Sequence, residues 1–293
     1  MKVLLTGSNG QLGRELSQQL ETKKINFVGY DMPEFDVTNK EKIIEIINKE
    51  KPTVIINCGA LTNVDGCETQ RELAMAINAT GPQNLAEIAR DQDIVLVQVS
   101  TDYVFDGAGI LENGVLRPYV ETDPIDPRTV YGESKAAGEK AVSEIAPKYF
   151  ILRTAWLYGD GNNFVKTMLD LASKHPKLTV VEDQVGSPTS TVDLAAAIID
   201  LIQTDHYGLY HGTCEGQCSW YDFALEIFKL SGIDIKVEPV TSEQFVRPAP
   251  RPKYSVLENK ALNILKMNHF RPWRDSLAEY LEKLQSVSGK RQL

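Results

Sequence analysis

Tyr131 and Lys135 are the pair of residues whose types and spacing point most directly to chemistry. They lie four residues apart in Tyr131-Gly-Glu-Ser-Lys135, and a helix brings side chains at this spacing onto one face. A free tyrosine has a pKa of about 10, so it exchanges protons poorly at neutral pH unless a neighbouring cation stabilises the phenolate. Lys135 can supply that cation. Tyr–Lys pairs at this spacing are also common on helix surfaces, so this pair indicates acid–base chemistry only in a chain that also contains a cofactor motif.

Two hydroxyl groups, on Ser100 and Thr101, follow the apolar run Ile94–Val99. The run predicts a buried strand, and the binding sites of open α/β sheets form at the carboxyl ends of strands. A hydroxyl group at such an end can hold a substrate carbonyl. The sequence does not choose between Ser100 and Thr101, and an ordinary polar strand end has the same pattern.

A cofactor motif is present near the start of the chain. Gly7, Gly10 and Gly13 have the spacing G-x-x-G-x-x-G between a predicted strand at 2–5 and a predicted helix at 11–21. Glycines permit a tight turn and let backbone N–H groups approach a pyrophosphate at the helix N-terminus. We therefore expect a dinucleotide site, which makes the catalytic interpretation of Tyr131 and Lys135 the stronger one.

Two residues give opposite indications about which dinucleotide binds. Asp31 ends the second predicted strand, where an acidic side chain usually accepts hydrogen bonds from the adenosine ribose and favours NAD. Arg14 follows the third glycine and could pair with the 2′-phosphate of NADP. We expect NADP, with NAD as the second possibility. Asp36, followed by Val37, is expected to be the N-cap of the next helix.

The rest of the first half alternates strands with helices. This order predicts an α/β fold, a Rossmann-type doubly wound parallel sheet with helices on both faces. The small residues of Asn57–Thr62, after the third predicted strand, would let a flat ligand lie against the backbone. The remaining predicted strands are 26–30, 54–57, 94–99 and 149–154, and the helices are 40–49, 71–90 and 131–144.

Beyond Tyr158 the pattern predicts a smaller C-terminal substrate-binding lobe. We expect a dinucleotide-binding domain at 1–160, to which roughly 190–212 return, and a lobe formed by roughly 161–189 and 213–287. Predicted helices here are 163–173, 192–203, 221–230 and 273–283. The segment Arg247–Lys253 holds three prolines and three basic residues, so it is expected to be neither helix nor central strand.

Composition excludes several classes of protein. With 31 basic and 40 acidic residues the net charge is −9, which disfavours a nucleic-acid or membrane-surface binder. The chain has no apolar run long enough for a membrane span and no signal-peptide core, so a cytoplasmic protein is expected. The four cysteines and four histidines show no metal-ligand spacing, and no metal is expected. An anionic ligand needs a local basic patch, for which Arg251 is the best candidate.

Several stretches resemble the extended short-chain dehydrogenase/reductases, and within them the dTDP-4-dehydrorhamnose reductases. The likeness covers nearly the whole chain. It is carried by Gly10–Gly13, Asp36–Thr38, Thr62–Asp65, Ser100–Asp106, Val130–Lys135, Arg153–Gly159, Gly161–Phe164, Asp183–Thr189 and Arg251–Leu257.

The resemblance implies reduction of the 4-keto group of dTDP-4-keto-6-deoxy-L-mannose to dTDP-L-rhamnose, a step of polysaccharide precursor synthesis, with hydride from NAD(P)H. It implies that Tyr131 donates a proton, that Lys135 lowers its pKa and holds the ribose, and that Thr101 binds the carbonyl. A homodimer is the family's expectation. The implied cofactor contacts are Gln11, Leu12, Gly13, Asp31, Asp36, Val37, Ala60, Leu61 and Thr62, and the implied sugar contacts are Asp102 and Trp156.

Two alternatives share the fold. An epimerase or dehydratase would keep its cofactor and return the hydride, but a dehydratase is expected to have a glutamate after Asp102, where this chain has Tyr103. The second alternative is a regulatory subunit without catalytic activity, because the β subunit of methionine adenosyltransferase resembles these reductases. The intact set of Thr101, Tyr131 and Lys135 argues against it, since a subunit without catalysis has no chemical need for them.

Overall fold

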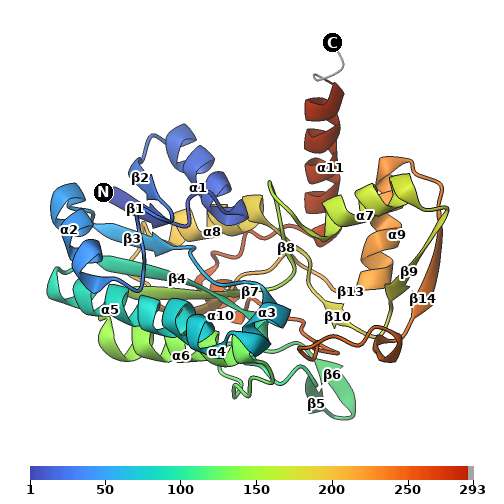
Figure 1. The fold of residues 1–293 in the computed structure, drawn as a ribbon, viewed down its shortest axis with the longest axis horizontal. Helices are drawn as coiled ribbons and strands as arrows, with labels where there is room; N and C mark the ends of the chain where they lie inside the picture. The colour runs from blue at the N-terminus through green and yellow to red at the C-terminus, as the bar shows by residue number, and fades with distance from the viewer. Residues whose placement is uncertain (290–293) are drawn as a thin grey trace.

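A parallel six-stranded sheet forms the centre of the larger part of the molecule (Figure 1). The structure is a computed structural model that describes the backbone of residues 1–289 and the side chains of residues 1–286. The strand order is β12-β7-β4-β3-β1-β2, which confirms the predicted Rossmann-type α/β fold. The bounds are β1 Lys2–Thr6, β2 Asn26–Tyr30, β3 Val54–Asn57, β4 Val95–Thr101, β7 Tyr149–Thr154 and β12 Gly208–His211.

Both faces of the sheet are covered by helices because alternate residues of each strand are apolar on opposite sides. In β1, Val3 and Leu5 belong to the core beneath α1 and α8, whereas Leu4 belongs to the core beneath α2, α5 and α6. Burial of one such side chain stabilises the fold by about 1.5–3 kcal/mol. The helices are α1 Gln11–Thr22, α2 Lys40–Glu50, α5 Gly81–Asp91, α6 Val130–Ile145 and α8 Thr191–Leu201.

The order of the strands fixes where a ligand can enter. β1 pairs with β2 on one side and with β3 on the other. The connection that follows β1 therefore runs toward one edge of the sheet, and the connection that follows β3 runs toward the opposite edge. A crevice opens at the carboxyl ends of strands where the order reverses. The segment at Gly7 and the segment after Asn57 meet at this point.

A second group of elements lies beside the carboxyl edge of the sheet, to the right in Figure 1. Its two longer strands, β9 and β14, pair in parallel. The segment expected to return to the first domain contains α8 and β12. α8 packs against α1, and β12 pairs with β7 in the central sheet. The exact domain bounds stay a prediction. The elements of the group are β8 Leu157–Tyr158, α7 Phe164–Lys174, β9 Lys177–Val181, β10 Val185–Gly186, β11 Thr189–Ser190, β13 Cys218–Ser219, α9 Trp220–Ser231, β14 Lys236–Val240, η3 Ser242–Gln244 and α11 Trp273–Gly289. α10 Lys260–Leu265 lies instead against β12 of the central sheet.

The long helix predicted at 71–90 is interrupted. It consists of α4 (Arg71–Met75), the π-helix η1 (Ala76–Thr80) and α5. Pro82 has no N–H group, so the regular hydrogen-bond ladder cannot run through it. The prediction also missed the short elements α3 Val64–Thr69, η2 Asp102–Val104, β5 Ile110–Glu112 and β6 Val115–Arg117, which are too short for hydrophobic periodicity to identify.

Two further expectations concern single segments. Residues 247–253 form an irregular loop, as their prolines predicted. Asp36 does not cap α2; Asn39 is the N-cap and accepts from the Lys42 N–H at 3.0 Å, so that prediction was wrong. Asp36 instead closes a local turn by accepting from the N–H and hydroxyl of Thr38, a competing use of a short acidic side chain. Among the described helices, none has the length and apolar character needed to cross a membrane.

Candidate active site

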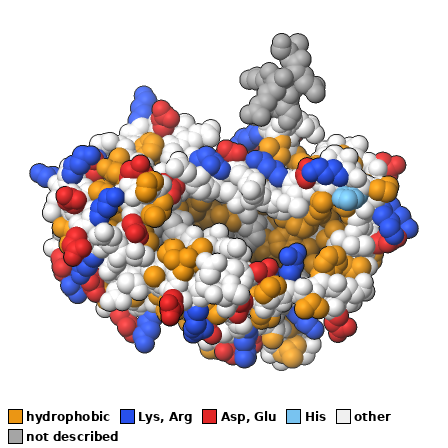
Figure 2. Space-filling model, in the orientation of Figure 1, with side chains coloured by type: hydrophobic (Ala, Val, Ile, Leu, Met, Phe, Trp, Pro, Cys, Tyr) orange, Lys and Arg blue, Asp and Glu red, His pale blue; other side chains and the backbone are white. Residues whose placement is uncertain are grey.

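A cavity of about 1120 Å³ lies between the carboxyl edge of the sheet and the second group of elements. Figure 2 shows this hollow, with hydrophobic side chains inside it. All but one of the predicted site residues line it. Those that do are Gly7, Gly10, Gln11, Leu12, Gly13, Asp31, Asp36, Val37, Ala60, Leu61, Thr62, Thr101, Asp102, Tyr131, Lys135, Trp156 and Arg251.

The glycine loop forms a cradle that side chains would fill. Gly7 has φ of 64°, and a Cβ there would lie 2.7 Å from the Gly59 nitrogen. A Cβ on Gly13 would lie 2.1 Å from the Gly7 carbonyl oxygen. Only glycine allows this close approach of loop, helix and neighbouring strand end. The N-terminus of α1 is therefore open to an anionic group, as a pyrophosphate requires.

Asp31 and Arg14 both bind the backbone of Asn9 in the glycine loop. Asp31 Oδ2 accepts from the Asn9 N–H at 2.9 Å. Arg14 donates to the Asn9 carbonyl and to the Asp160 carbonyl, and its Nε lies 3.2 Å from Asp160 Oδ2. Arg14 is the one predicted site residue that does not line the cavity.

Asn78, which sequence reasoning missed, fixes the strand end that bears Ala60, Leu61 and Thr62. Its side chain accepts from the Leu61 N–H at 2.9 Å and donates to the Leu61 carbonyl at 3.0 Å. It also donates to Ser134 Oγ on α6 at 3.0 Å. Asn78 lies in the π-helix next to Gly81-Pro82, and that break was the only sequence signal that could have drawn attention to it.

Tyr131 lies in the first turn of α6, beside Thr101. Thr129 caps this helix by accepting from the Gly132 N–H at 3.0 Å. Burial raises the pKa of the Tyr131 hydroxyl, although a hydrogen bond with Thr101 acts in the opposite direction. The Tyr131 hydroxyl is therefore held in its protonated form, the form that a proton donor needs.

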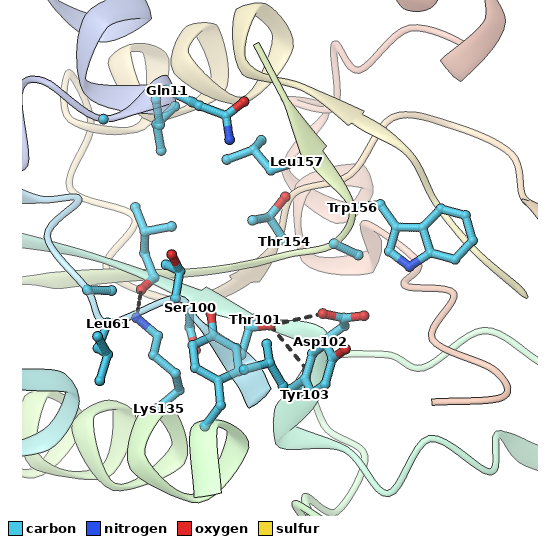
Figure 3. Close-up of a pocket in the computed structure, with 18 of the residues that line it drawn as sticks. Gln11, Leu61, Ser100, Thr101, Asp102, Tyr103, Lys135, Thr154, Trp156 and Leu157 are labelled. Carbon is cyan, nitrogen blue, oxygen red and sulfur yellow. Dashed lines mark hydrogen bonds between the residues drawn. The ribbon is translucent and has the colours of Figure 1, made fainter. Parts of the chain in front are cut away.

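Lys135 lies one turn further along the buried face of α6. Its Nζ donates to the Val99 carbonyl at 2.6 Å, as Figure 3 shows. Burial lowers its pKa to about 8, while the carboxylate of Glu139 raises it. The support of a phenolate that is expected of Lys135 concerns the charge that forms when Tyr131 gives up a proton.

Asp102 is a buried carboxyl group, only 3% exposed, at the bottom of the cavity. Its Oδ1 accepts from the Thr101 hydroxyl at 2.9 Å, and its Oδ2 has no partner among the described residues. Burial raises its pKa to about 6, while the Ser255 hydroxyl and the hydrogen bond from Thr101 both lower it. Ser100 Oγ is likewise buried and without a partner in the described chain, whereas Thr101 contacts both Asp102 and Tyr131.

We expect the Asp102→Asn variant to be more stable at neutral pH. Because the folded pKa lies above the ordinary value, the folded protein binds a proton between the pKa values of 3.8 and about 6 that the unfolded chain has released. The free energy of unfolding therefore falls as pH rises through that window, and removal of the charge recovers about 1–3 kcal/mol. Urea unfolding of both proteins across this range measures the difference. A less stable variant at neutral pH would show that the charge is compensated.

Trp156 and Arg251 also line the cavity, and each has a partner from a distant segment. Trp156 follows β7 and stacks on Trp220, with ring centroids 3.5 Å apart. Arg251 donates to Asp65 Oδ2 at 2.8 Å, and Asp65 Oδ1 accepts from the Ala249 N–H at 3.2 Å. The irregular loop is thereby tied to α3 at the cavity, although the two segments lie about 186 residues apart in the chain.

Comparison with known proteins gives the same assignment over the full chain. A dTDP-4-dehydrorhamnose reductase of Streptomyces griseus is 41% identical, covering 98% of this chain and 95% of the relative. A crystal structure of a dTDP-4-dehydrorhamnose reductase from Clostridium acetobutylicum has a TM-score of 0.93 and 52% identity, covering 97% of this chain and all of that one.

A second solved structure carries a cofactor. The dTDP-4-dehydrorhamnose reductase of Bacillus anthracis in complex with NADP has a TM-score of 0.91 and 40% identity, covering 96% of this chain and 99% of that one. The sequence model of the family described as RmlD substrate binding domain matches residues 1–286. With this match and these full-length relatives, the chain belongs to the RmlD substrate-binding-domain family, the family of the dTDP-4-dehydrorhamnose reductases.

Proposed function

We propose that this protein reduces the 4-keto group of dTDP-4-keto-6-deoxy-L-mannose to dTDP-L-rhamnose, with hydride from NADPH. One observation carries the proposal: the glycine cradle, Thr101, Tyr131 and Lys135 line a single cavity. The relatives named above support the choice of substrate, because they bear the name of this reductase over the full chain length.

The residues that would hold the cofactor fit such a group. The first turn of α1, after the glycine loop, has backbone N–H groups that a helix leaves without intrahelical partners, and Asp31, Val37 and Ala60 line the cavity with it. When bound, NADPH supplies the hydride that adds to the keto carbon. The relative from Bacillus anthracis, whose structure contains NADP, supports NADPH as the preferred form.

The proton that completes the reduction comes from Tyr131. Its hydroxyl lies beside Thr101 Oγ1, so both can contact one carbonyl oxygen. In the substrate complex the Thr101 hydroxyl turns its single proton from Asp102 Oδ1 to that oxygen, and Tyr131 transfers its proton to the same oxygen, leaving a phenolate. The Lys135 cation on the next turn stabilises the phenolate. A Tyr131 pKa raised by burial suits this direction, because the donor stays protonated until the alkoxide forms.

The diphosphate of the substrate requires cations in an acidic protein. Arg251 and Arg247 line the cavity and both face Asp65, at 2.8 Å and 3.9 Å. We assign Arg251 to the diphosphate, because its guanidinium has donors left beyond the pair with Asp65. Asp102 and Trp156 also line the cavity, and we assign both to the sugar.

The assay that tests the function follows NADPH oxidation in the presence of dTDP-4-keto-6-deoxy-L-mannose. We expect one NADPH oxidised for each dTDP-L-rhamnose formed. An epimerase or a dehydratase would convert its sugar without net oxidation, and a regulatory subunit would bind without turnover. Either result would contradict the proposed function.

We expect Asp31 to limit the preference for NADPH. Its carboxylate lines the cofactor end of the cavity and would repel a 2′-phosphate. The Asp31→Asn variant should raise kcat/KM for NADPH relative to NADH by a factor of about 3–10, which corresponds to roughly 1 kcal/mol. If Arg14 binds the 2′-phosphate, the Arg14→Ala variant should lower the ratio of kcat/KM for NADPH to kcat/KM for NADH. An unchanged ratio in both variants would assign the preference to other residues.

A further inference from the structure

Three polar side chains follow one another along the buried face of α6. Tyr131, Lys135 and Glu139 are four residues apart, a spacing that aligns side chains on one side of a helix, and all three are buried. The proposed proton transfer uses the first two. Glu139 lies one turn beyond Lys135, outside the cavity lining, and is only 5% exposed. A glutamate is rarely buried to this extent without a partner.

The partner of Glu139 is Arg153 of β7. Arg153 Nε lies 2.9 Å from Oε1 and 3.1 Å from Oε2 of Glu139, and Arg153 Nη2 donates to Oε2 at 2.7 Å. Arg153 is itself 4% exposed, and its guanidinium lies over the ring of Phe105, 5.0 Å from the centroid. A planar fork that binds both carboxylate oxygens fixes their orientation. The charge of Glu139 is therefore held at one place between α6 and β7.

Stability does not account for this ion pair. Removing two charges from water costs free energy that their attraction only partly returns, and apolar side chains of similar volume often serve as well in such a place. Arg153 Nη1 also has no hydrogen-bond partner in the part of the chain that the structure describes. A buried, incompletely satisfied pair next to Lys135 points to a role in the chemistry of that lysine.

Lys135 needs a counter-charge in its buried position. Its Nζ donates to the carbonyl of Val99, which is a neutral acceptor (Figure 3). Burial disfavours the charged form of an amine, and a nearby anion favours it. Burial lowers the pKa of Lys135 to about 8, and the charge of Glu139 acts in the opposite direction. Without that anion, a smaller fraction of the lysine would carry the charge on which the phenolate depends.

The other titratable groups around Lys135 do not take this role. Those on the neighbouring elements are Cys58 after β3, Cys67 of α3, Asp102 and Tyr103 of η2, and His211 of β12. The two thiols and the phenol are neutral at neutral pH, because burial raises the pKa of each. The histidine is neutral because burial lowers its pKa to about 3. Asp102 binds the Thr101 hydroxyl, and its charge acts on Tyr131, which leaves Glu139 as the anion beside Lys135.

We propose that Glu139 is the counter-ion that keeps the buried ammonium of Lys135 charged while the phenolate forms on Tyr131. Arg153 holds the Glu139 carboxylate at that position, and both are positioning residues, since each acts through Lys135. Arg153 also takes the direct hydrogen bonds of the carboxylate, so the ammonium stays on the Val99 carbonyl and remains available to Tyr131. This inference rests on the proposed function and goes beyond it, because it gives an ion pair outside the cavity a part in the proton transfer.

Glu139→Gln removes the anion and keeps the size of the side chain. The pKa of Lys135 should fall by roughly one to two pH units, so that kcat declines from a lower pH than the value of about 8 set by the wild-type lysine. We expect kcat to be about tenfold below that of the wild type at a pH of about 8, and within about twofold at a pH of about 6. Disturbed packing alone would lower kcat equally across this range. Glu144→Gln, the same change on the exposed side of α6, should leave the profile unchanged.

A double variant tests the part played by Arg153. In Glu139→Gln the guanidinium remains as an unopposed buried cation, which lowers the pKa of Lys135 further. Glu139→Met combined with Arg153→Met removes both charges and leaves two apolar side chains. The decline in kcat should then begin between the pH of the wild type and that of Glu139→Gln. The double variant also keeps the test open if the unopposed cation prevents Glu139→Gln from folding.

Nuclear magnetic resonance of lysine labelled with ¹³C at Cε gives a readout that does not depend on turnover. The Lys135→Met variant identifies the Lys135 signal by its loss. That signal should titrate at about 8 in the wild type and roughly one to two pH units lower in Glu139→Gln, with an intermediate value in the double variant. In Glu144→Gln it should titrate as in the wild type.

The outcomes separate this inference from the proposed function. A Lys135 signal that titrates at the wild-type pH in both Glu139→Gln and the double variant would overturn the counter-ion, even in an enzyme that reduces the keto sugar. A signal displaced as expected, in a protein that does not turn over the keto sugar, would support the counter-ion and count against the reductase. A double variant whose titration lies below that of Glu139→Gln would overturn the part assigned to Arg153.

Discussion

Replacing Tyr131 with phenylalanine lowers kcat by a factor of about 10²–10⁴, the usual contribution of a positioned acid. The variant keeps the ring, which packs edge-on against Tyr103 with centroids 5.5 Å apart, and loses only the hydroxyl beside Thr101. The expected loss is in kcat, because the proton is needed as the alkoxide forms. Steady-state kinetics with the keto sugar, and a separate titration with NADPH, measure the two effects.

A matched control removes a tyrosine hydroxyl elsewhere on the sheet. Tyr149 begins β7, at the end of the strand opposite the cavity, and Tyr149→Phe should retain wild-type kcat. Affinity for NADPH should be the same in all three proteins. Turnover in Tyr131→Phe equal to that of the wild type would remove the proton-transfer mechanism.

Turnover falls as pH rises through about 8, the pKa of Lys135 in its buried position. The charged form is present below that pKa, and only the charged form stabilises the phenolate left on Tyr131. Above it, kcat should fall by about tenfold for each further pH unit, as expected for the loss of one essential proton. Lys135→Met should lower kcat by about 10²-fold at neutral pH, since a neighbouring charge is lost in a low-dielectric site.

The control for Lys135 lies on the same helix. Lys140 is on the exposed side of α6, where it pairs with Glu144 at 3.9 Å, and Lys140→Met should leave both kcat and the pH profile unchanged. Lys135→Met should also lose the decline above a pH of about 8. A variant that keeps this decline would assign the titration to another group.

The core of the fold was predictable because its signals are local. Runs such as Val54–Ile56 and Ile94–Val97 are continuous and apolar, as strands buried on both faces must be. The glycine motif and the Tyr131–Lys135 pair each lie within a few residues of sequence. Their arrangement around one cavity follows from the rule that carboxyl ends of parallel strands share an edge, and the structure places them there.

The parts that sequence reasoning missed depend on contacts between distant segments. Asn78 holds the segment after β3 in place through its hydrogen bonds with Leu61 and Ser134. The helix propensity of Asn78 gives no information about these partners. The stack of Trp156 on Trp220 joins residues 64 positions apart and needs a residue with positive φ and a glycine at 186. The N-cap of α2 was misplaced because Asp36 and Asn39 are equally suitable by type, and only the path of the backbone decides between them.

Transfer of deuterium from the cofactor to the sugar is the most direct test of the central claim. With NADPH deuterated at the transferable position of nicotinamide C4, the account predicts dTDP-L-rhamnose that carries one deuterium at C4, formed together with NADP⁺. Product without deuterium, or a sugar converted while the NADPH stays reduced, would contradict the claim that this cavity joins a hydride donor to the keto carbon beside Tyr131.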